Sequence, residues 1–162
     1  MIFRHRYGWV GILGVVLWMT ACEKLPDTLP PPKEPAPGTM GYYCGMTLEE
    51  HPGPKGQIWV TGEKNALWFS SVADAFSYLK LEGITRPVAA FYVHDMGRAD
   101  WDQPQPGTWI RAESAFFSVG GRRTGGMGAT EIVPFATQDQ ADIFSRQYGG
   151  RVKNYQEVIE NY

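Results

Sequence analysis

The sequence has few cysteines and no excess of basic residues, and each shortage excludes a class of protein. Its 162 residues include only Cys22 and Cys44, too few for a disulfide-dense scaffold. Lysine and arginine total 15 against 17 acidic residues, so the formal net charge of −2 offers no basic footprint for nucleic acid. Six Trp, eight Tyr and eight Phe supply a core for one domain. We therefore expect a globular protein that does not bind nucleic acid.

The chain also lacks an apolar run long enough to span a membrane, but its amino end is typical of a signal peptide. Arg4 and Arg6 precede an uncharged stretch from Trp9 to Met19. This stretch is too short for a comfortable transmembrane helix and has the charge pattern of a secretory signal. A buried core helix is the alternative interpretation.

The apolar stretch ends at Ala21-Cys22, and this junction resembles the lipobox of bacterial lipoproteins. The resemblance implies cleavage after residue 21 and a lipid anchor on Cys22. The segment removed contains two of the fifteen basic residues, so the net charge shifts from −2 to −4. Glu23 replaces the aspartate that commonly retains lipoproteins in the inner membrane, which favours the outer membrane of a Gram-negative cell.

A proline-rich linker is predicted after the anchor. Six prolines occur between Glu23 and Gly38, with almost no apolar residue able to build a core. Such chains favour the extended polyproline II conformation, at about 3.1 Å per residue. The sequence therefore predicts three parts: a signal peptide (1–21), the lipidated cysteine with its linker (22–39) and a globular domain (40–162).

Within the globular part, two segments 66 residues apart carry the same helix signals. In Phe69–Ala75 and Phe135–Ala141, an aromatic residue ends an apolar run and a Ser or Thr follows that can cap a helix. An Asp or Gln three residues later can complete a capping box. The correspondence extends to Gly83 and Gly149, each placed where a helix C-terminus needs a left-handed residue. Chance similarity is the alternative, because helix caps are common.

These signals predict helices at 71–82 and 138–148. The first has an apolar stripe at positions i, i+3, i+4 and i+7, and the second has a thinner one. Strand-like segments flank the helices at 57–60, 66–69, 88–93, 115–119, 131–135 and 151–154. We therefore predict an α+β fold in which two tandem β-β-α-β units form one compact domain.

Cys44 is the first candidate for a functional residue, because it is the one cysteine left after lipidation. It begins the triplet Cys44-Gly45-Met46, and His51 lies seven residues beyond it. Thiolate and thioether sulfurs are soft donors that select Cu(I), and imidazole is an acceptable third ligand. Gly45 would let the backbone turn both sulfurs towards one ion. The alternative is a small buried cysteine beside a core methionine.

Two further candidates lie far from Cys44 in the sequence. Met127 stands between glycines in the segment 124–128, where little of its own segment can bury it. We expect it at a site, although it could instead fold back over its loop. His94 is followed by Asp95, a carboxylate that can orient an imidazole as a ligand or as a base. A structural histidine at a strand end is the alternative.

The order of these motifs resembles that of the NosL family, the copper-binding lipoproteins that accompany nitrous oxide reductase. In chain order the motifs are Cys44-Gly45-Met46 with His51-Pro52, Phe69 and the helix after it, Tyr92-Val93-His94-Asp95 with Trp101, Met127-Gly128, Val133-Pro134-Phe135, and Gly149-Gly150 before Val152. The resemblance spans essentially the whole mature domain.

The resemblance implies a periplasm-facing, lipid-anchored Cu(I) chaperone. Such a protein passes copper to an acceptor in the maturation apparatus of nitrous oxide reductase, and it is a carrier rather than an enzyme. The implied copper ligands are Cys44, Met46, Met127 and His51, with His94 as a weaker candidate.

One departure from the family pattern lies next to Cys44. Many relatives carry a second cysteine three residues earlier, where this chain has Gly41. A thiolate with one methionine sulfur and an imidazole already makes the two- or three-coordinate soft site that Cu(I) accepts. We therefore expect Gly41 to affect affinity and thiol redox pairing rather than copper binding itself.

Two other functions are compatible with the sequence. An enzyme would use Cys44 as nucleophile, His94 as base and Asp95 or another carboxylate as the orienting group. A structural lipoprotein would only dock onto a partner, with Cys44 buried and inert. Stoichiometric Cu(I) binding would distinguish a carrier from both.

Overall fold

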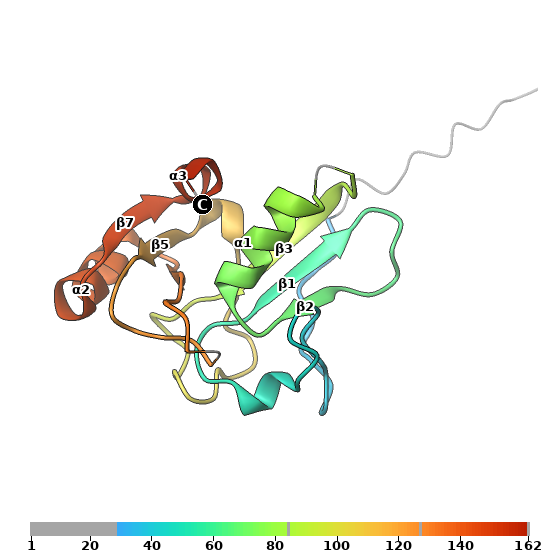
Figure 1. Cartoon of the computed structure of the whole chain (residues 1–162), viewed down its shortest axis with the longest axis horizontal. Helices are drawn as coiled ribbons and strands as arrows, with labels where there is room; N and C mark the ends of the chain where they lie inside the picture. Colours follow the sequence, from blue (N-terminus) through green and yellow to red (C-terminus); the bar gives the residue numbers. More distant parts are fainter. Residues whose placement is uncertain (1–28, 84, 127, 162) are drawn as a thin grey trace, which may run out of the picture.

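A computed structural model describes residues 29–83, 85–126 and 128–161 (Figure 1). In chain order the elements are η1 (Leu48–Glu50), β1 (Gly56–Val60), β2 (Leu67–Phe69), α1 (Val72–Leu81), β3 (Val88–His94), β4 (Trp109–Arg111), η2 (Ala112–Ser114), β5 (Phe116–Val119), β6 (Val133–Phe135), α2 (Gln138–Tyr148), β7 (Arg151–Asn154) and α3 (Tyr155–Asn161). None of the helices in these ranges is long and apolar enough to cross a membrane. The predicted signal peptide and Cys22 lie outside the described residues.

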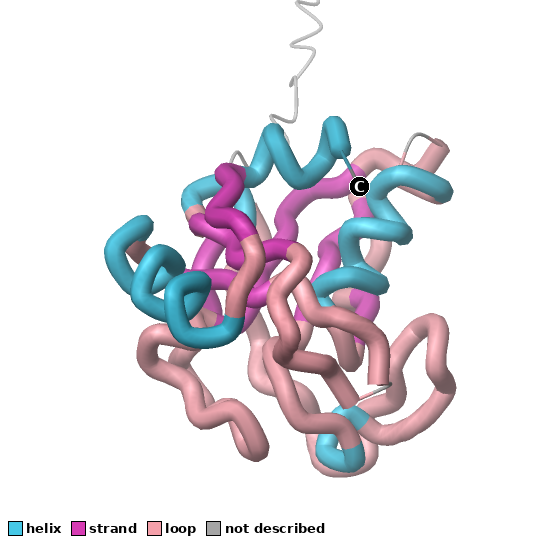
Figure 2. The backbone as a smooth tube through the Cα atoms, turned by 60° about the vertical axis from the view of Figure 1, so that its left-hand side comes forward, coloured by secondary structure: helices cyan, strands magenta, loops and turns pink. Residues whose placement is uncertain are grey.

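Two antiparallel sheets make up the fold, and in each sheet a helix connects two of the strands. The larger sheet has the strand order β2-β1-β3-β4 and the smaller one β6-β5-β7. In both sheets, the first strand of the β-β-α-β unit lies between the second and third strands of that unit. A helix joins the second strand to the third. Figure 2 shows the helices on the outside of the strands. The predicted tandem β-β-α-β arrangement is confirmed.

Short elements are the main addition to the prediction. β4 extends the larger sheet by pairing with β3 in the register Val93↔Ile110. α3 follows β7 without a loop and contributes Val158, which is buried. Elements of three to seven residues are too short to display a hydrophobic period, so the sequence did not predict them.

The helix starts follow the predicted caps. The Ser71 side chain accepts a hydrogen bond from the backbone N–H of Ala73, and the Thr137 side chain accepts one from Gln140. The side chain of Gln140 accepts a bond from the Thr137 hydroxyl. This is a different contact from the predicted capping-box bond to the cap backbone.

The two helices end differently, which corrects one prediction. Gly149 ends α2 with φ 78°, as expected. Gly83 does not adopt a positive φ, and its N–H bonds instead to the carbonyl of Tyr78. A Cβ at residue 83 would lie 2.6 Å from the carbonyl oxygen of Leu79. Close approach of the backbone, rather than a left-handed conformation, explains this glycine.

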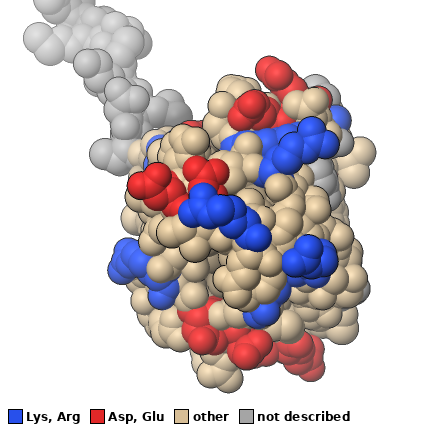
Figure 3. Space-filling view, turned by 90° about the vertical axis from the view of Figure 1, so that its left-hand side faces the viewer, with Lys and Arg blue, Asp and Glu red and all other residues tan. Residues whose placement is uncertain are grey.

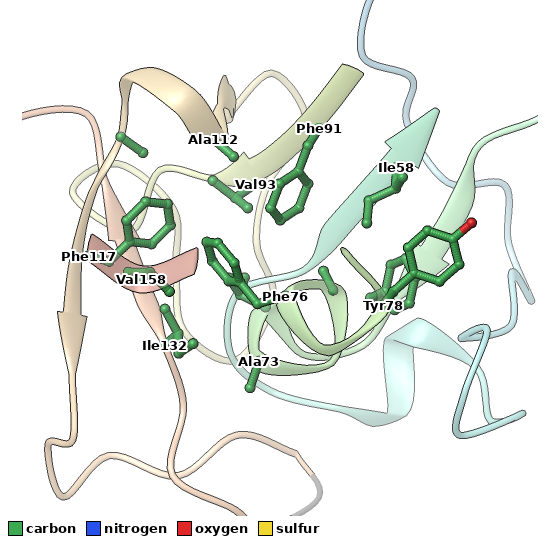
Figure 4. Close-up of a cluster of buried hydrophobic side chains, with 14 of the residues drawn as sticks. Ile58, Ala73, Phe76, Tyr78, Phe91, Val93, Ala112, Phe117, Ile132 and Val158 are labelled. Carbon is green, nitrogen blue, oxygen red and sulfur yellow. The ribbon is translucent and has the colours of Figure 1, made fainter. Parts of the chain in front are cut away.

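One aromatic core joins the two sheets (Figure 4). Phe76 of α1 packs edge-on against Phe91 of β3 and Phe117 of β5, with ring centroids 5.4 and 5.3 Å away. Ile132 and Val158 are buried in the same cluster. Each such side chain contributes roughly 1.5–3 kcal/mol by leaving water. The two β-β-α-β units therefore share this cluster.

The proline-rich segment is not free up to residue 39. The backbone of Lys33 forms two hydrogen bonds with the side chain of Gln57, at 3.0 and 2.9 Å. The carbonyl of Pro30 accepts a 2.8 Å bond from the hydroxyl of Tyr92. Contacts with the sheet therefore begin no later than Pro30, within the segment predicted as a linker. A proline-rich segment has no hydrophobic period that could have indicated this.

Charged side chains of both signs are mixed on the face that carries α2 and β7. Figure 3 shows basic and acidic groups side by side there, with acidic groups gathered along the lower edge. Above that edge, the two signs alternate on the part of this face that the structure describes.

Candidate metal-binding site

Cys44 lies close to the start of α1. Its Sγ is 3.3 Å from the Oγ of Ser70, and Ser70 directly precedes Ser71, the N-cap of the helix. The thiol is half-buried and free of any disulfide. Cys44 is therefore a soft donor that remains accessible from the surface.

The turn that carries Cys44 is closed by backbone hydrogen bonds. The N–H of Gly45 donates to the carbonyl of Gly41, and the N–H of Gly41 donates to that of Met46, both at 2.9 Å. Gly45 has φ 63°, which glycine adopts without strain. Met46 follows directly with its side chain exposed. The predicted turn at Gly45 is present, between the two sulfur residues.

His51 is buried without a hydrogen-bond partner on its ring. The residue is 5% exposed, and both Nδ1 and Nε2 are shielded and unpaired among the described residues. Buried imidazoles normally satisfy at least one nitrogen by hydrogen bonding, because an unpaired buried polar atom is costly. Either ring nitrogen of His51 can therefore serve as a ligand atom.

The glycine-rich loop reaches His51. Gly126 packs so closely that a Cβ there would lie 2.5 Å from the Nδ1 of His51. The loop is a tight turn, closed by bonds from Gly125 to Ala129 and from Gly128 to Gly125, both 2.9 Å. Met127 itself lies outside the described residues. Gly126, the residue before Met127, is thus in contact with His51.

Lys55 supports the segment that carries His51, and no motif in the sequence marks Lys55. Its side chain is buried, and Nζ donates 2.6 Å bonds to the carbonyls of both His51 and Gly53. Burial lowers the pKa of Lys55 to about 8, while the negative charges of Glu131 and Cys44 act in the opposite direction. Lys55 thus fixes the backbone on both sides of Pro52.

Glu131 ties the glycine-rich loop to α1. Its Oε1 accepts bonds from the Ser71 hydroxyl at 3.0 Å and from the N–H groups of Ala73 and Ile132 at 3.2 and 2.9 Å. Its Oε2 is buried, has no hydrogen-bond partner among the residues that the structure describes, and lies against Gly125. Burial raises the pKa of Glu131 to about 7, although these bonds and the charge of Lys55 oppose the shift. No sequence pattern marks Glu131, since acidic residues before strands are ordinarily exposed.

His94 is buried in different surroundings. Its Nδ1 accepts a 3.4 Å hydrogen bond from the backbone N–H of Lys55. The centroid of its ring lies 3.8 Å from the ring centroid of Trp109. Burial, and then the charge of Lys55, lower the pKa of His94 to about 3. His94 is therefore a neutral imidazole with one nitrogen already bonded. With His51 it lines a cavity of about 320 Å³.

Asp95 does not orient His94, which corrects the predicted pairing. Its Oδ1 accepts 3.0 Å bonds from the N–H groups of Gly97 and Ala136. The carboxylate thus fixes the turn after β3 to the segment before α2. Adjacent residues in a strand point to opposite faces, so an imidazole and the carboxylate that follows it need not meet.

The described residues contain no group of three or more His, Cys, Asp and Glu side chains able to hold a metal ion. Zinc and calcium sites in proteins are built from such groups. Methionine sulfur is not counted among these side chains, and it suits soft ions such as Cu(I).

The fold and these donor types indicate a class: a small α+β domain for binding a soft metal ion. The chain belongs to the NosL family, whose family model matches residues 32–162. It is 42% identical over 151 residues to the copper-binding lipoprotein NosL of Achromobacter cycloclastes, covering 92% of this chain and 78% of that protein. It is 33% identical over 159 residues to the protein of the same name from Stutzerimonas stutzeri, covering 95% and 82%.

A solved structure has the same fold. The crystal structure of the copper chaperone NosL from Shewanella denitrificans superimposes with a TM-score of 0.73 and 34% identity. The match covers 82% of this chain and all of that one. The family that the order of motifs indicated is thereby confirmed.

Proposed function

We propose that this chain is a membrane-anchored Cu(I) metallochaperone that delivers copper for assembly of the copper centres of nitrous oxide reductase. Two relatives are named copper-binding lipoproteins, and the structural relative is named a copper chaperone. The observation that carries the proposal is His51, a buried imidazole beside the glycine-rich loop whose two nitrogens have no hydrogen-bond partner in the described part of the chain. A metal ion would supply the partner that this ring lacks.

We assign the copper ligands to Cys44, Met46, Met127 and His51. Contacts of neighbouring residues link Cys44 to His51: the Sγ of Cys44 lies against Ser70, the next residue Ser71 donates to Glu131, and Glu131 and His51 lie against the adjacent glycines 125 and 126. A thiolate, thioethers and a neutral imidazole are the donors that favour the monovalent ion over harder divalent ions. His94 is the weaker candidate, since its Nδ1 already accepts a hydrogen bond.

Partial exposure of the site suits transfer of the ion. Cys44 is half-buried and Met46 is 38% exposed, so donors of an acceptor protein can reach the copper. A neutral thioether binds Cu(I) less tightly than a thiolate, and the acceptor would replace it first. The acceptor belongs to the maturation apparatus of nitrous oxide reductase.

The lipid on Cys22 would hold the domain at the periplasmic side of a membrane. Both curated relatives are named lipoproteins, which supports an anchor of this kind. Glu23 after the lipidated cysteine favours the outer membrane over the inner one.

The structure offers no support for an enzyme. Among the described residues, the hydrogen bonds of Cys44, His94 and Asp95 join none of these three side chains to another. A nucleophile needs a base within hydrogen-bond reach, so we interpret the chain as a carrier.

Anaerobic competition with a Cu(I) chelator tests copper binding by the mature chain. We expect about one Cu(I) per chain and a loss of at least about 100-fold in affinity for Cys44→Ser, because a hard hydroxyl replaces a soft thiolate. Met46→Leu should weaken binding less. Met40→Leu is the matched control, since Met40 is 59% exposed and outside the assigned set. Equal affinity of wild type and Cys44→Ser would overturn the proposal.

Delivery is tested in cells that express the reductase. Cys44→Ser should leave the chain in the membrane fraction and lower the copper content of purified nitrous oxide reductase. A fully loaded reductase in that strain would show that the chain is not its copper donor.

A further inference from the structure

Residues 30–34, here called the strap, lie on the outer face of the larger sheet in a fixed backbone conformation. The N–H of Lys33 donates to Oε1 of Gln57 at 3.0 Å, and Nε2 of Gln57 donates to the carbonyl of Lys33 at 2.9 Å. This exchange has the pattern of a residue pair between antiparallel strands. Gln57 is fully buried, so its amide has these partners in place of water.

The surface under the strap is aromatic. Trp59 and Tyr92 are each 6% exposed and belong to a cluster that Trp68 and Trp109 flank. The ammonium of Lys33 lies 4.8 Å from the centre of the Trp59 ring, and the hydroxyl of Tyr92 donates to Pro30. Aromatic grooves with hydrogen-bond donors bind extended proline-rich segments, because these segments lose little entropy on docking.

Glu34 fastens the other end of the strap. One carboxylate oxygen accepts a 2.8 Å bond from the N–H of Gly107, and the other accepts a 3.1 Å bond from Nε1 of Trp109. The strap is thus held at Pro30, Lys33 and Glu34, by β3, β1, β4 and the loop that precedes β4.

We propose that the outer face of the larger sheet is a receptor for a proline-rich segment, occupied by the chain's own strap, and that docking sets how far the domain reaches from its anchor. The reach depends on the proposed lipid on Cys22. With the strap docked, the free chain runs from Cys22 to Pro30 and spans at most about 28 Å. If the chain were free as far as Met40, it would span about 60 Å.

Docking also fixes which end of the domain lies away from the anchor. The strap leads into a segment in which the N–H of Leu48 in η1 donates to Thr39. Figure 1 shows η1 at the lower end of the domain, whereas the blue start of the described chain lies higher, beside β3. His51 directly follows η1. The candidate copper site therefore lies at the end remote from the anchor, where an acceptor can approach.

Amide hydrogen exchange in the mature chain without lipid tests the docked strap. We expect slow exchange at Lys33 and Gly107, and exchange at Gly107 at least about tenfold faster in Glu34→Ala, which removes the acceptor. Glu160→Ala is the control, an exposed carboxylate on α3. A second variant, Lys33→Pro, removes the N–H that bonds Gln57 but keeps an extended strap. Exchange at Lys33 and Gly107 as fast as in an unstructured peptide would overturn the docked strap.

Neutron reflectometry of the lipidated chain on a supported phosphatidylethanolamine–phosphatidylglycerol bilayer tests the reach. Wild type should form a thin protein layer close to the bilayer, and the double variant Lys33→Pro with Glu34→Ala a thicker, more diffuse one. Identical profiles would overturn the role in reach. If the wild-type chain forms no layer, the proposed lipid anchor is wrong, and the proposed role of the strap in reach is wrong too. Hydrogen exchange then still decides whether the outer face of the larger sheet is a receptor for the strap.

Discussion

Gly126 lies directly against the ring of His51, so closely that a methyl group at residue 126 would come within 2.5 Å of Nδ1. Only glycine allows the loop that carries Met127 to approach the imidazole in this way. The contact places the residue that precedes Met127 against His51, although Met127 and His51 are 76 positions apart in the sequence.

The Gly126→Ala substitution should push the loop away from His51. We expect the affinity for Cu(I) to fall by about tenfold or more, equivalent to about 1.4 kcal/mol, with a smaller change in thermal stability. Competition titration and thermal unfolding of the same sample measure both. Gly128→Ala is the control: it has open space around its Cβ but φ 75°, so it should cost stability and leave affinity nearly intact. Unchanged copper affinity in Gly126→Ala would argue against a site between loop and ring.

Gly41 lies so close to Cys44 that a side chain added at residue 41 would meet the thiol of Cys44. A Cβ at residue 41 would lie 2.6 Å from the Sγ of Cys44. We therefore expect Gly41→Cys to bind Cu(I) more tightly than wild type under reductant, and to lose binding in air when the two thiols pair. Thiol counting and chelator competition, each with and without reductant, measure this. Thr61→Cys adds an exposed thiol elsewhere as the control. Two free thiols after air oxidation would contradict the expectation.

The parts of the fold that the sequence predicted are those governed by local signals. The bounds of α2 and β7 were predicted without error, because a capping threonine and Gly149 mark the helix ends. The end of α1 was predicted within one residue, but for the wrong reason, since Gly83 is required by contact with Leu79. Local sequence identifies a glycine without showing which constraint it satisfies.

The candidate site depends on contacts between distant segments, and these were not predictable. Soft donors at Cys44 and Met46 are visible in the sequence, since their chemistry does not depend on the fold. The hydrogen bonds by which Lys55 and Glu131 support the site are not visible in the sequence, because the burial of these two residues follows from how the two sheets pack. The docked strap was missed for the same reason: the aromatic surface under Lys33 is assembled from β1, β3 and β4.

Glu131 should make stability depend on pH in the acid range. Its pKa rises from the ordinary 4.5 to about 7 on folding, so the folded chain binds a proton that the unfolded chain releases. The stability from neutral Glu131 is complete below pH 4.5 and is lost as pH rises through 7, by about 3 kcal/mol at most. Lys55, with its pKa lowered to about 8, titrates above this window.

Urea unfolding between pH 4.5 and 7.5 measures this effect. Glu131→Gln keeps an oxygen acceptor but cannot ionise, so its stability should fall less with rising pH than that of wild type. Glu160→Gln, an exposed carboxylate, should follow the wild-type curve. Parallel curves for Glu131→Gln and wild type would show that the buried carboxyl does not titrate in this range.

Met127 should contribute to copper binding and release without contributing to the core. Its glycine neighbours free it from local packing, so Met127→Ala should leave folding nearly unchanged and reduce Cu(I) affinity less than Cys44→Ser, because a neutral thioether binds more weakly than a thiolate. In cells it should lower the copper content of nitrous oxide reductase. Met96 is the matched control, since it packs against the cluster of Val133 and Phe135. Its truncation should cost roughly 2–5 kcal/mol and leave copper affinity unaltered. If Met127→Ala behaves like Met96→Ala, Met127 belongs to the core and the copper site must be built from Cys44, Met46 and His51.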